Sequence, residues 1–240
     1  MRRAFTILAM VLCGLAAPPV AIAGPWARDA GDVFLSASLT AEEARNDLLM
    51  GLIQPDTTTG LYAEIGLGHR LTFGLDIQRS DGGETTLGFL RHTLTPPDAT
   101  WQFAFDLGAG QRRTTAIDDS TLIRFGLSLG RGFGAGNGPW FLPMAHQGGW
   151  LTLDARATQD LAFDEPILQA EATIGLAMSD RLRLISTLKV EHWPGSEALF
   201  SYLPSLVYDI RPGTSVQLGG RLSDGGADVV GLTLGIWQAF

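Results

Sequence analysis

Apolar residues alternate with polar or small residues through most of the chain. From Trp101 to Gly108, Trp, Phe, Phe and Leu take every second position, and Gln, Ala, Asp and Gly lie between them. Successive side chains of a β-strand point to opposite faces, so a period of two predicts strands with one apolar and one polar face. Such segments recur with a length of roughly ten residues between Gly, Pro and Asp turns, the spacing of a transmembrane up-and-down β-barrel.

About twelve antiparallel strands are predicted, in an all-β fold. They cover residues 32–40, 58–68, 70–79, 84–94, 100–112, 121–132, 150–158, 166–178, 181–192, 198–210, 214–222 and 228–240. In two of them, 84–94 and 198–210, the faces do not separate: Arg91 falls on the face of Leu87 and Phe89, which suggests a bulge or a wrong phase. Residues 41–50 favour a short helix in a loop. The long connection 133–149 leaves room for two more strands around 140–142, so ten to fourteen strands are possible.

The first residues have the form of a secretory signal peptide. A positive start, Met1-Arg2-Arg3, precedes an apolar stretch over 4–17 and a small-x-small site, Ala21-Ile22-Ala23. We therefore expect a cleaved signal peptide over 1–23 and a single barrel domain over 24–240. The only cysteine, Cys13, lies in the signal, so the exported protein is expected to have no disulfide and no cysteine metal site.

The charge of the exported chain restricts its partners. Removing Arg2 and Arg3 leaves 17 − 2 = 15 basic residues against 25 acidic ones, a net charge of −10. This balance argues against a nucleic-acid partner. After residue 23 no segment approaches the roughly 18 uninterrupted apolar residues of a membrane helix. A membrane location therefore requires a closed barrel, because only a closed sheet satisfies its backbone polar groups in lipid.

The last strand carries a pattern of its own. Val230, Leu232, Leu234, Ile236 and Phe240 form its apolar face and end in an aromatic residue, although Gln238 interrupts the series. This pattern resembles the C-terminal signature of bacterial outer-membrane β-barrel proteins, in which the final aromatic residue is read by the barrel-assembly machinery. The resemblance implies that machinery and outer-membrane lipid as partners, and the outer membrane of a Gram-negative bacterium as the location.

If both ends of the chain lie in the periplasm, short turns and longer loops should alternate along the strands. Interfacial aromatic girdles would then be formed at the periplasmic ends by Trp101, Trp150, Tyr208, Trp237 and Phe240, and at the outer end by Trp193.

The polar faces of the strands predict the lining of a lumen. The charged residues placed there are Glu64, Asp76, Asp106, Arg124, Asp154, Arg156, Glu171, Arg183, Lys189, Glu191 and Arg221. As a small porin-like channel the barrel would pass small hydrophilic solutes along these charges. Alternatively, the charges pair across the interior and fill a non-conducting structural barrel or one that binds envelope partners. A strongly basic lumen, which a channel for acidic sugars would need, is not visible.

Two further alternatives are an outer-membrane lipid-modifying enzyme and a soluble periplasmic β-barrel carrier. Catalysis would need a serine with a nearby histidine, and the chain has His69, His92, His146 and His192. The only candidate cluster is His192 with Glu191 and Ser196, and neighbours on a strand face opposite ways. We therefore predict no enzyme. No metal-ligand spacing appears, and no helix follows the Gly-x-Gly runs as a phosphate loop requires, so no metal or cofactor is expected.

Overall fold

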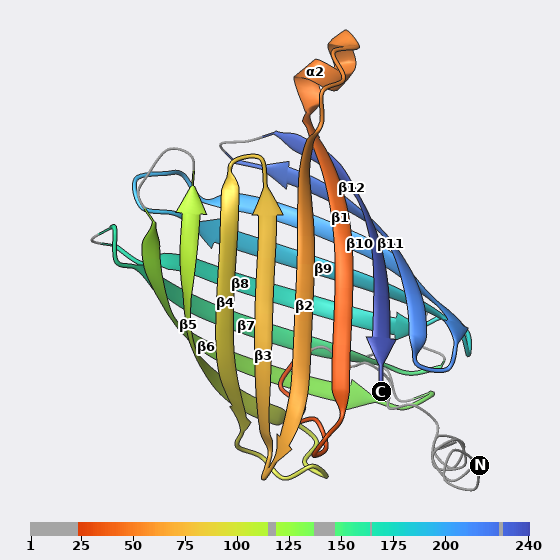
Figure 1. Cartoon of the computed structure of the whole chain (residues 1–240). Helices are drawn as coiled ribbons and strands as arrows, with labels where there is room; N and C mark the ends of the chain where they lie inside the picture. The colour runs from red at the N-terminus through yellow and green to blue at the C-terminus, as the bar shows by residue number, and fades with distance from the viewer. Residues whose placement is uncertain (1–23, 115–118, 137–146, 164, 226–227) are drawn as a thin grey trace, which may run out of the picture.

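The chain forms one closed barrel of twelve antiparallel strands (Figure 1). The structure is a computed structural model and describes residues 24–114, 119–136, 147–163, 165–225 and 228–240. The strands are β1 Val33–Ala44, β2 Asp56–Gly68, β3 Leu71–Ser80, β4 Gly83–Thr93, β5 Gln102–Thr114, β6 Ser120–Phe133, β7 Gly149–Asp160, β8 Ile167–Ala177, β9 Leu182–His192, β10 Leu199–Arg211, β11 Thr214–Asp224 and β12 Val229–Ala239. Each strand pairs with its neighbours in the sequence, and β12 pairs with β1 to close the sheet. The predicted all-β barrel and its strand number are confirmed.

Connections alternate between the two ends of the barrel, but the predicted alternation of short turns with longer loops holds only in part. Asp81 and Gly82 alone join β3 to β4 at the upper end, and the long connection from β6 to β7 starts and ends at the lower end. The C-terminus and the start of β1 lie at the lower end in Figure 1, and the helix α2 Arg45–Met50 projects from the upper end between β1 and β2. Turns at the lower end are tight: His69 and Arg70, with φ of 51° and 62°, join β2 to β3, and Pro212-Gly213 join β10 to β11. Residues with positive φ give such a turn the twist of the strands it connects.

The connection between β6 and β7 lies at the same end as these turns. Residues 140–142, where two further strands were considered, are outside the described part of the chain, as is the expected signal peptide over 1–23. The strands β6 and β7 pair directly with each other from Leu122 to Phe133. The barrel therefore closes with twelve strands.

Apolar side chains cover the outside of the barrel. On β12, the side chains of Leu232, Leu234 and Ile236 are 67%, 60% and 50% exposed. Phe73 on β3 and Leu188 on β9 are similarly exposed. No helix among the described residues is long and apolar enough to cross a bilayer. The outward face of the strands is thus suited to lipid, because a membrane barrel surrounds itself with an apolar band.

The two ambiguous strands have apolar residues on their inner face. In β4, Leu87, Phe89 and Arg91 all point inward and are buried, and the pairing of β4 with β3 and β5 is continuous, so the suggested bulge is absent. In β10, Val207 points inward and is fully buried, and a register irregularity lies near Asp209 at the lower end. The sequence pattern failed here because the interior of this barrel is partly apolar.

Two of the predicted girdle residues are also inside, and a third, Trp193, lines the upper end of the interior with its ring against Arg112. Trp150 is 3% exposed, and the indole N–H of Trp237 donates to Gln217 at 3.1 Å on the inner face. Trp101, Tyr208 and Phe240 are 42%, 45% and 70% exposed and lie on the outer surface. The interior of this narrow barrel takes up large aromatic rings, so a tryptophan near a strand end is not by itself an interfacial residue.

Candidate functional site: a charged lumen with an inserted N-terminal segment

The inside of the barrel holds a cavity of about 510 Å³. The cavity runs from Gly24 and Thr152 near the lower end to Arg112 and Trp193 near the upper end. A second space of about 400 Å³, the outer vestibule, lies between the upper parts of β1, β2, β3 and β11. Both spaces are lined by Ser36, Tyr62, Asp76 and Gln78, so they adjoin each other at these residues.

Eight of the eleven predicted lumen residues line the central cavity: Glu64, Asp76, Arg124, Asp154, Arg156, Glu171, Lys189 and Glu191. The other three lie elsewhere. Asp106 is 2% exposed behind Arg124, Arg221 lines the outer vestibule, and Arg183 is bound at the lower end to Asp209 and Ser215. The structure also places in the lining Arg28, Arg91 and Arg112, which the sequence pattern did not identify.

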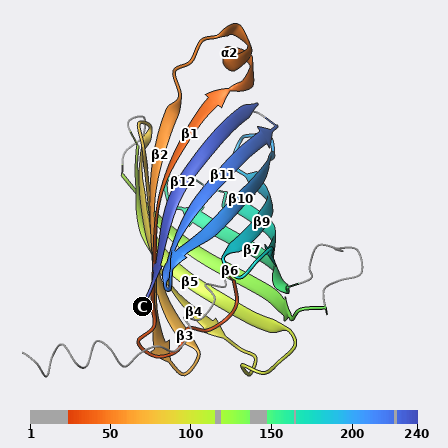
Figure 2. The same ribbon diagram turned by 90° about the vertical axis from the view of Figure 1, so that its right-hand side faces the viewer.

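The lower part of the lumen is occupied by the residues that precede β1, Gly24 to Asp32, which we call the N-terminal segment. Gly24 lies against Thr152 of β7, and Pro25 packs on Gly130 of β6. Further along, the backbone of Asp29 lies on Gly66 of β2. Because β2 and β7 are on different sides of the barrel, the segment crosses the lumen near the end at which β1 begins and β12 ends (Figure 2).

Hydrogen bonds to the barrel wall hold the N-terminal segment in place. The Thr93 hydroxyl donates to the Pro25 carbonyl at 2.6 Å, and Arg91 Nη1 donates to the Gly24 carbonyl at 3.0 Å. Pro25 itself is fully buried. Each of these bonds joins the segment to a buried side chain of β4, so the segment is a fixed part of the interior.

Glycine on the wall makes room for this segment at two positions. A Cβ at Gly130 would lie 2.7 Å from Pro25 Cγ and from Trp26 Cη2, and a Cβ at Gly66 would lie 1.9 Å from the Asp29 carbonyl oxygen. Atoms cannot approach that closely, so any side chain at either position would displace the segment. The wall of the barrel is therefore shaped to accept it.

Glu64 joins the N-terminal segment to the wall through charge. Its carboxylate accepts from Arg28 Nε at 2.5 Å, from Arg91 Nη1 at 2.8 Å and from the Tyr62 hydroxyl at 2.5 Å, and its side chain is 6% exposed. The Arg28 guanidinium also lies over the ring of Phe34, 4.8 Å from its centre. One buried carboxylate thus compensates two arginines, one from the segment and one from β4.

A row of aromatic rings continues along this wall. Ring centres are 5.8 Å apart between Trp237 and Phe34, 6.4 Å between Phe34 and Tyr62, and 6.1 Å between Tyr62 and Phe89. Phe89, Leu87 and Leu122 form a buried apolar cluster, with Tyr62 against it. These side chains come from β1, β2, β4 and β12, with Leu122 from β6, and they fill part of the lumen.

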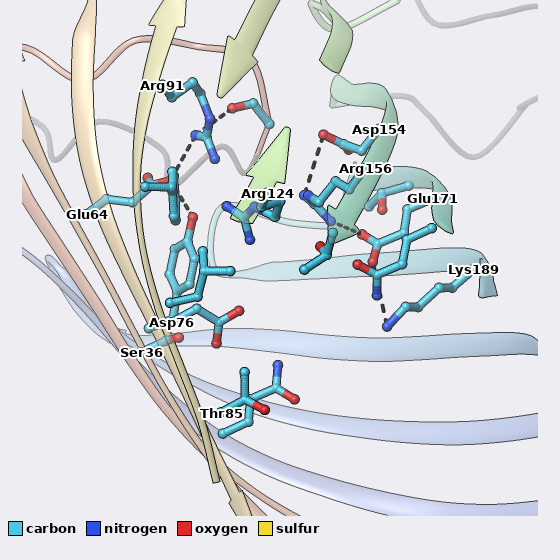
Figure 3. A pocket seen from close by; sticks show the side chains of 18 of the residues that line it. Ser36, Glu64, Asp76, Thr85, Arg91, Arg124, Asp154, Arg156, Glu171 and Lys189 are labelled. Atoms are coloured by element: carbon cyan, nitrogen blue, oxygen red, sulfur yellow. Dashed lines mark hydrogen bonds and ion pairs between the residues drawn. The ribbon is translucent and has the colours of Figure 1, made fainter. Parts of the chain in front are cut away.

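On the other side of the cavity the charges form ion pairs (Figure 3). Arg124 holds Asp106 through Nε and Nη2, both 3.0 Å from Oδ1, and its guanidinium lies 4.7 Å from the centre of the Phe89 ring. Arg156 contacts Glu171 at 3.3 Å and Asp154 at 3.7 Å. These pairs fix the directions of the side chains but leave several guanidinium N–H groups turned toward the space, since arginine has five donors.

Asp76 differs from the other acidic residues of the lining. Glu64, Asp154, Glu171 and Glu191 each form an ion pair, whereas Asp76 forms none within the described part of the chain. Figure 3 shows its carboxylate pointing into the open space from β3. It lies close enough to Arg124, Arg156 and Lys189 to interact with their charges. Asp76 thus presents a negative charge without a direct ion pair where the cavity meets the vestibule.

The histidine and serine considered for catalysis are not brought together. The Ser196 hydroxyl donates to the backbone oxygen of Trp193 at 2.9 Å rather than contacting His192. His92 lies on the outer face of β4 against the ring of Phe105, His69 is in the tight turn after β2, and His146 is outside the described residues. In the described chain no three His, Cys, Asp or Glu residues are grouped so as to hold a metal ion.

Comparison with known proteins identifies the architecture. The KdgM porin aligns over 85% of this chain and 99% of its own, with 9% identity and a TM-score of 0.59. The NanC porin aligns over 84% and 98%, with 10% identity and the same TM-score of 0.59. This chain has the fold of outer-membrane β-barrel porins. An outer membrane channel from Pseudomonas putida F1 aligns over 92% and 100%, with 12% identity and a TM-score of 0.55.

No protein-family model and no curated protein sequence matches the chain. A similar fold at 9–12% sequence identity indicates the architecture but not the function. The function therefore has to be argued from the lumen itself.

Proposed function

We propose that the protein is an outer-membrane channel for the passive passage of small hydrophilic solutes. The observation that carries this proposal is the open space inside a closed barrel, formed by the central cavity, which charged side chains line together with aromatic rings, and the outer vestibule that adjoins it. The known channels and porins with the same fold support it.

The proposed location rests on the outer surface of the barrel and on the sequence ends. The apolar outward face suits lipid, the expected signal peptide over 1–23 directs export, and the last strand resembles the signature read by the barrel-assembly machinery. In this arrangement the end of the barrel at which β1 begins and β12 ends faces the periplasm, and the helix α2 faces the outside.

The balance of charge in the lumen bears on the solute. Six basic side chains line the central cavity, namely Arg28, Arg91, Arg112, Arg124, Arg156 and Lys189. Five carboxylates also line the cavity, and two more lie next to it: Asp106 pairs with Arg124, and Asp160 pairs with Arg112. The net charge of all these groups is 6 − 7 = −1. KdgM porin has been solved in complex with disordered oligogalacturonate. A near-neutral lumen does not favour such a polyanion, and we therefore propose small solutes without a high net charge.

The N-terminal segment sets the size limit in this proposal. It crosses the lumen at the periplasmic end, held by Arg91, Thr93 and Glu64. Solutes would leave past the segment or after its displacement.

The test is uptake by liposomes that contain the folded protein without its signal peptide. Swelling in an isosmotic solution of L-arabinose is expected to be clearly faster than in protein-free liposomes. Folding is verified beforehand by the different gel mobility of heated and unheated samples. Swelling no faster than in the protein-free liposomes, from protein shown to be folded and inserted, contradicts the channel.

A non-conducting barrel is the second candidate, and the ion pairs of the lining favour it. All lining acids except Asp76 are paired, as in an interior that serves stability. This function predicts that arabinose does not enter even when the N-terminal segment is deleted, whereas the channel predicts faster entry in that variant.

The proposed assembly signal gives a separate prediction. The backbone N–H of Phe240 donates to the Val33 carbonyl at 2.9 Å, while its side chain is 70% exposed on the outside. Phe240→Ala keeps the backbone bond and removes the aromatic ring. We expect the amount of folded barrel in cells to fall severalfold and refolding of the purified chain in detergent to stay the same.

Leu218→Ala serves as the control, because Leu218 is 54% exposed on β11 and lies outside the signature. Equal cellular amounts of folded Phe240→Ala and Leu218→Ala would show that the ring is not read during assembly.

A further inference from the structure

Asp76 and Arg156 present opposite charges to the same open space from two sides of the lumen (Figure 3). Asp76 comes from β3, and Arg156 comes from β7, four strands away around the barrel. We propose that this space is a binding site for small zwitterions such as amino acids and short peptides, with the solute's ammonium group at Asp76 and its carboxylate at Arg156. The inference rests on the proposed channel function and names the class of solute that the channel favours.

The negative side of the site is a carboxylate without an ion-pair partner, which interacts with the side chain of Gln78. Asp76 forms no ion pair with any described residue, although it stands in a lumen where the other lining acids are paired. Removing a carboxylate from bulk water is unfavourable unless a cation or hydrogen-bond donor compensates it. Gln78 supplies a neutral donor. A solute with an ammonium group adds the close positive charge that Asp76 lacks, so we place the cationic group of the solute there.

The positive side of the site is an arginine held loosely enough to accept a ligand. Arg156 lies 3.3 Å from Glu171 and 3.7 Å from Asp154, both longer than the ~2.7–2.9 Å of a charge-assisted hydrogen bond. Its guanidinium therefore retains N–H donors for a solute carboxylate. Arg124, fixed on Asp106 and on the Phe89 ring, adds positive charge beside it.

Zwitterions fit this arrangement better than ions of one sign. A cation attracted to Asp76 meets Arg124 and Arg156 in the same space, and an anion attracted to the arginines meets Asp76 and the paired acids. Only a solute with both charges is favoured at both sides, because opposite charges on the two walls favour a dipole that is aligned across the lumen. The position of Asp76 between vestibule and cavity places the site on the path from outside.

The experiment compares glycylglycine with N-acetylglycinamide, a neutral compound of similar size, in the liposome swelling assay. In the native protein glycylglycine is expected to enter at least about threefold faster than N-acetylglycinamide. This is the factor in rate that one partly screened charge contact would give. Asp76→Asn should bring the ratio of the two rates close to one, and Arg156→Gln should lower it as well. Asp81→Asn, an equal change of charge in the exposed turn after β3, is expected to keep the native ratio.

The outcomes separate the inference from the channel function. Equal entry of both compounds into native liposomes, or a ratio that Asp76→Asn leaves unchanged, overturns the zwitterion site while the channel stands. Entry of neither compound overturns both. Gel mobility of heated and unheated samples shows that each variant is folded, and the conservative Asp76→Asn change removes a charge that contributes no ion pair to the barrel.

Discussion

Deletion of residues 24–30 is expected to raise the single-channel conductance roughly two- to threefold, because pore diameter and lining govern passage through a barrel. The deleted residues cross the lumen at its periplasmic end, and Pro25 among them is fully buried. Their bonds to Thr93 and Arg91 are lost in the variant, which leaves the twelve paired strands intact. The measurement is the size of current steps in a planar bilayer, compared with the undeleted protein.

Two substitutions in β6 test the same point without shortening the chain. Gly130→Leu places a side chain where a Cβ alone would be 2.7 Å from Pro25 and Trp26, so the N-terminal segment has to move. Gly132→Leu is its matched control on the same strand and face, because a Cβ there has no atom within 4 Å. Gly130→Leu should increase the conductance and Gly132→Leu should not. Equal conductance of the deletion variant and the native protein would show that the segment does not restrict the passage.

Replacement of Glu64 by alanine is expected to lower the free energy of unfolding by about 3–5 kcal/mol, the usual result of breaking a buried ion pair. Glu64 is 6% exposed and compensates Arg28 and Arg91 while accepting from the Tyr62 hydroxyl. Its loss leaves the buried guanidinium of Arg91 without that carboxylate. Urea unfolding in detergent micelles, followed by tryptophan fluorescence, measures the change.

The control for this prediction is Glu42→Ala. Glu42 pairs with Arg221 at 2.9 Å at the upper end, where the two side chains are 21% and 26% exposed. Water shields this pair, so its loss should cost less than about 1 kcal/mol. If the two variants unfold at the same urea concentration, Glu64 does not hold the interior in the way described.

The strand pattern of the sequence was sufficient to predict the barrel. A membrane barrel exposes apolar residues to lipid along every strand, and this requirement produces the strict alternation seen from Trp101 to Gly108 and in the last strand. Tight turns such as Pro212-Gly213 then give the strand count, and the even count places the start of the first strand and the end of the last strand at the same end of the barrel. The alternation and the turns depend on residues that are close together in the sequence, so both can be predicted from the sequence alone.

The interior was less predictable because it is decided by contacts between distant residues. Leu87 and Phe89 point inward and pack with Tyr62 and Leu122. Because two apolar residues share the inner face of β4 with Arg91, the sequence pattern did not show which face of this strand points inward. Likewise, the residues after the expected cleavage site show no periodicity that indicates insertion into the lumen. Gly66 and Gly130 were the available signal, but glycine on a strand has many other uses.

The pairing of charges was also beyond the sequence. The alternation predicted that Asp106, Arg124 and Arg183 face inward, but not that Asp106 is covered by Arg124 or that Arg183 is bound to Asp209. Only the side-chain contacts in the folded barrel show which acids form ion pairs. They show that Asp76 forms none with the described residues, and the proposed solute preference depends on this acid.

The central claim is that the charged lumen conducts, and single-channel recording tests it most directly. The folded protein without its signal peptide is inserted into a planar bilayer in potassium chloride solution. We predict discrete, reproducible current steps that become larger when residues 24–30 are deleted. Absence of steps from both proteins, each shown to be folded and inserted, would contradict the claim and identify a non-conducting barrel.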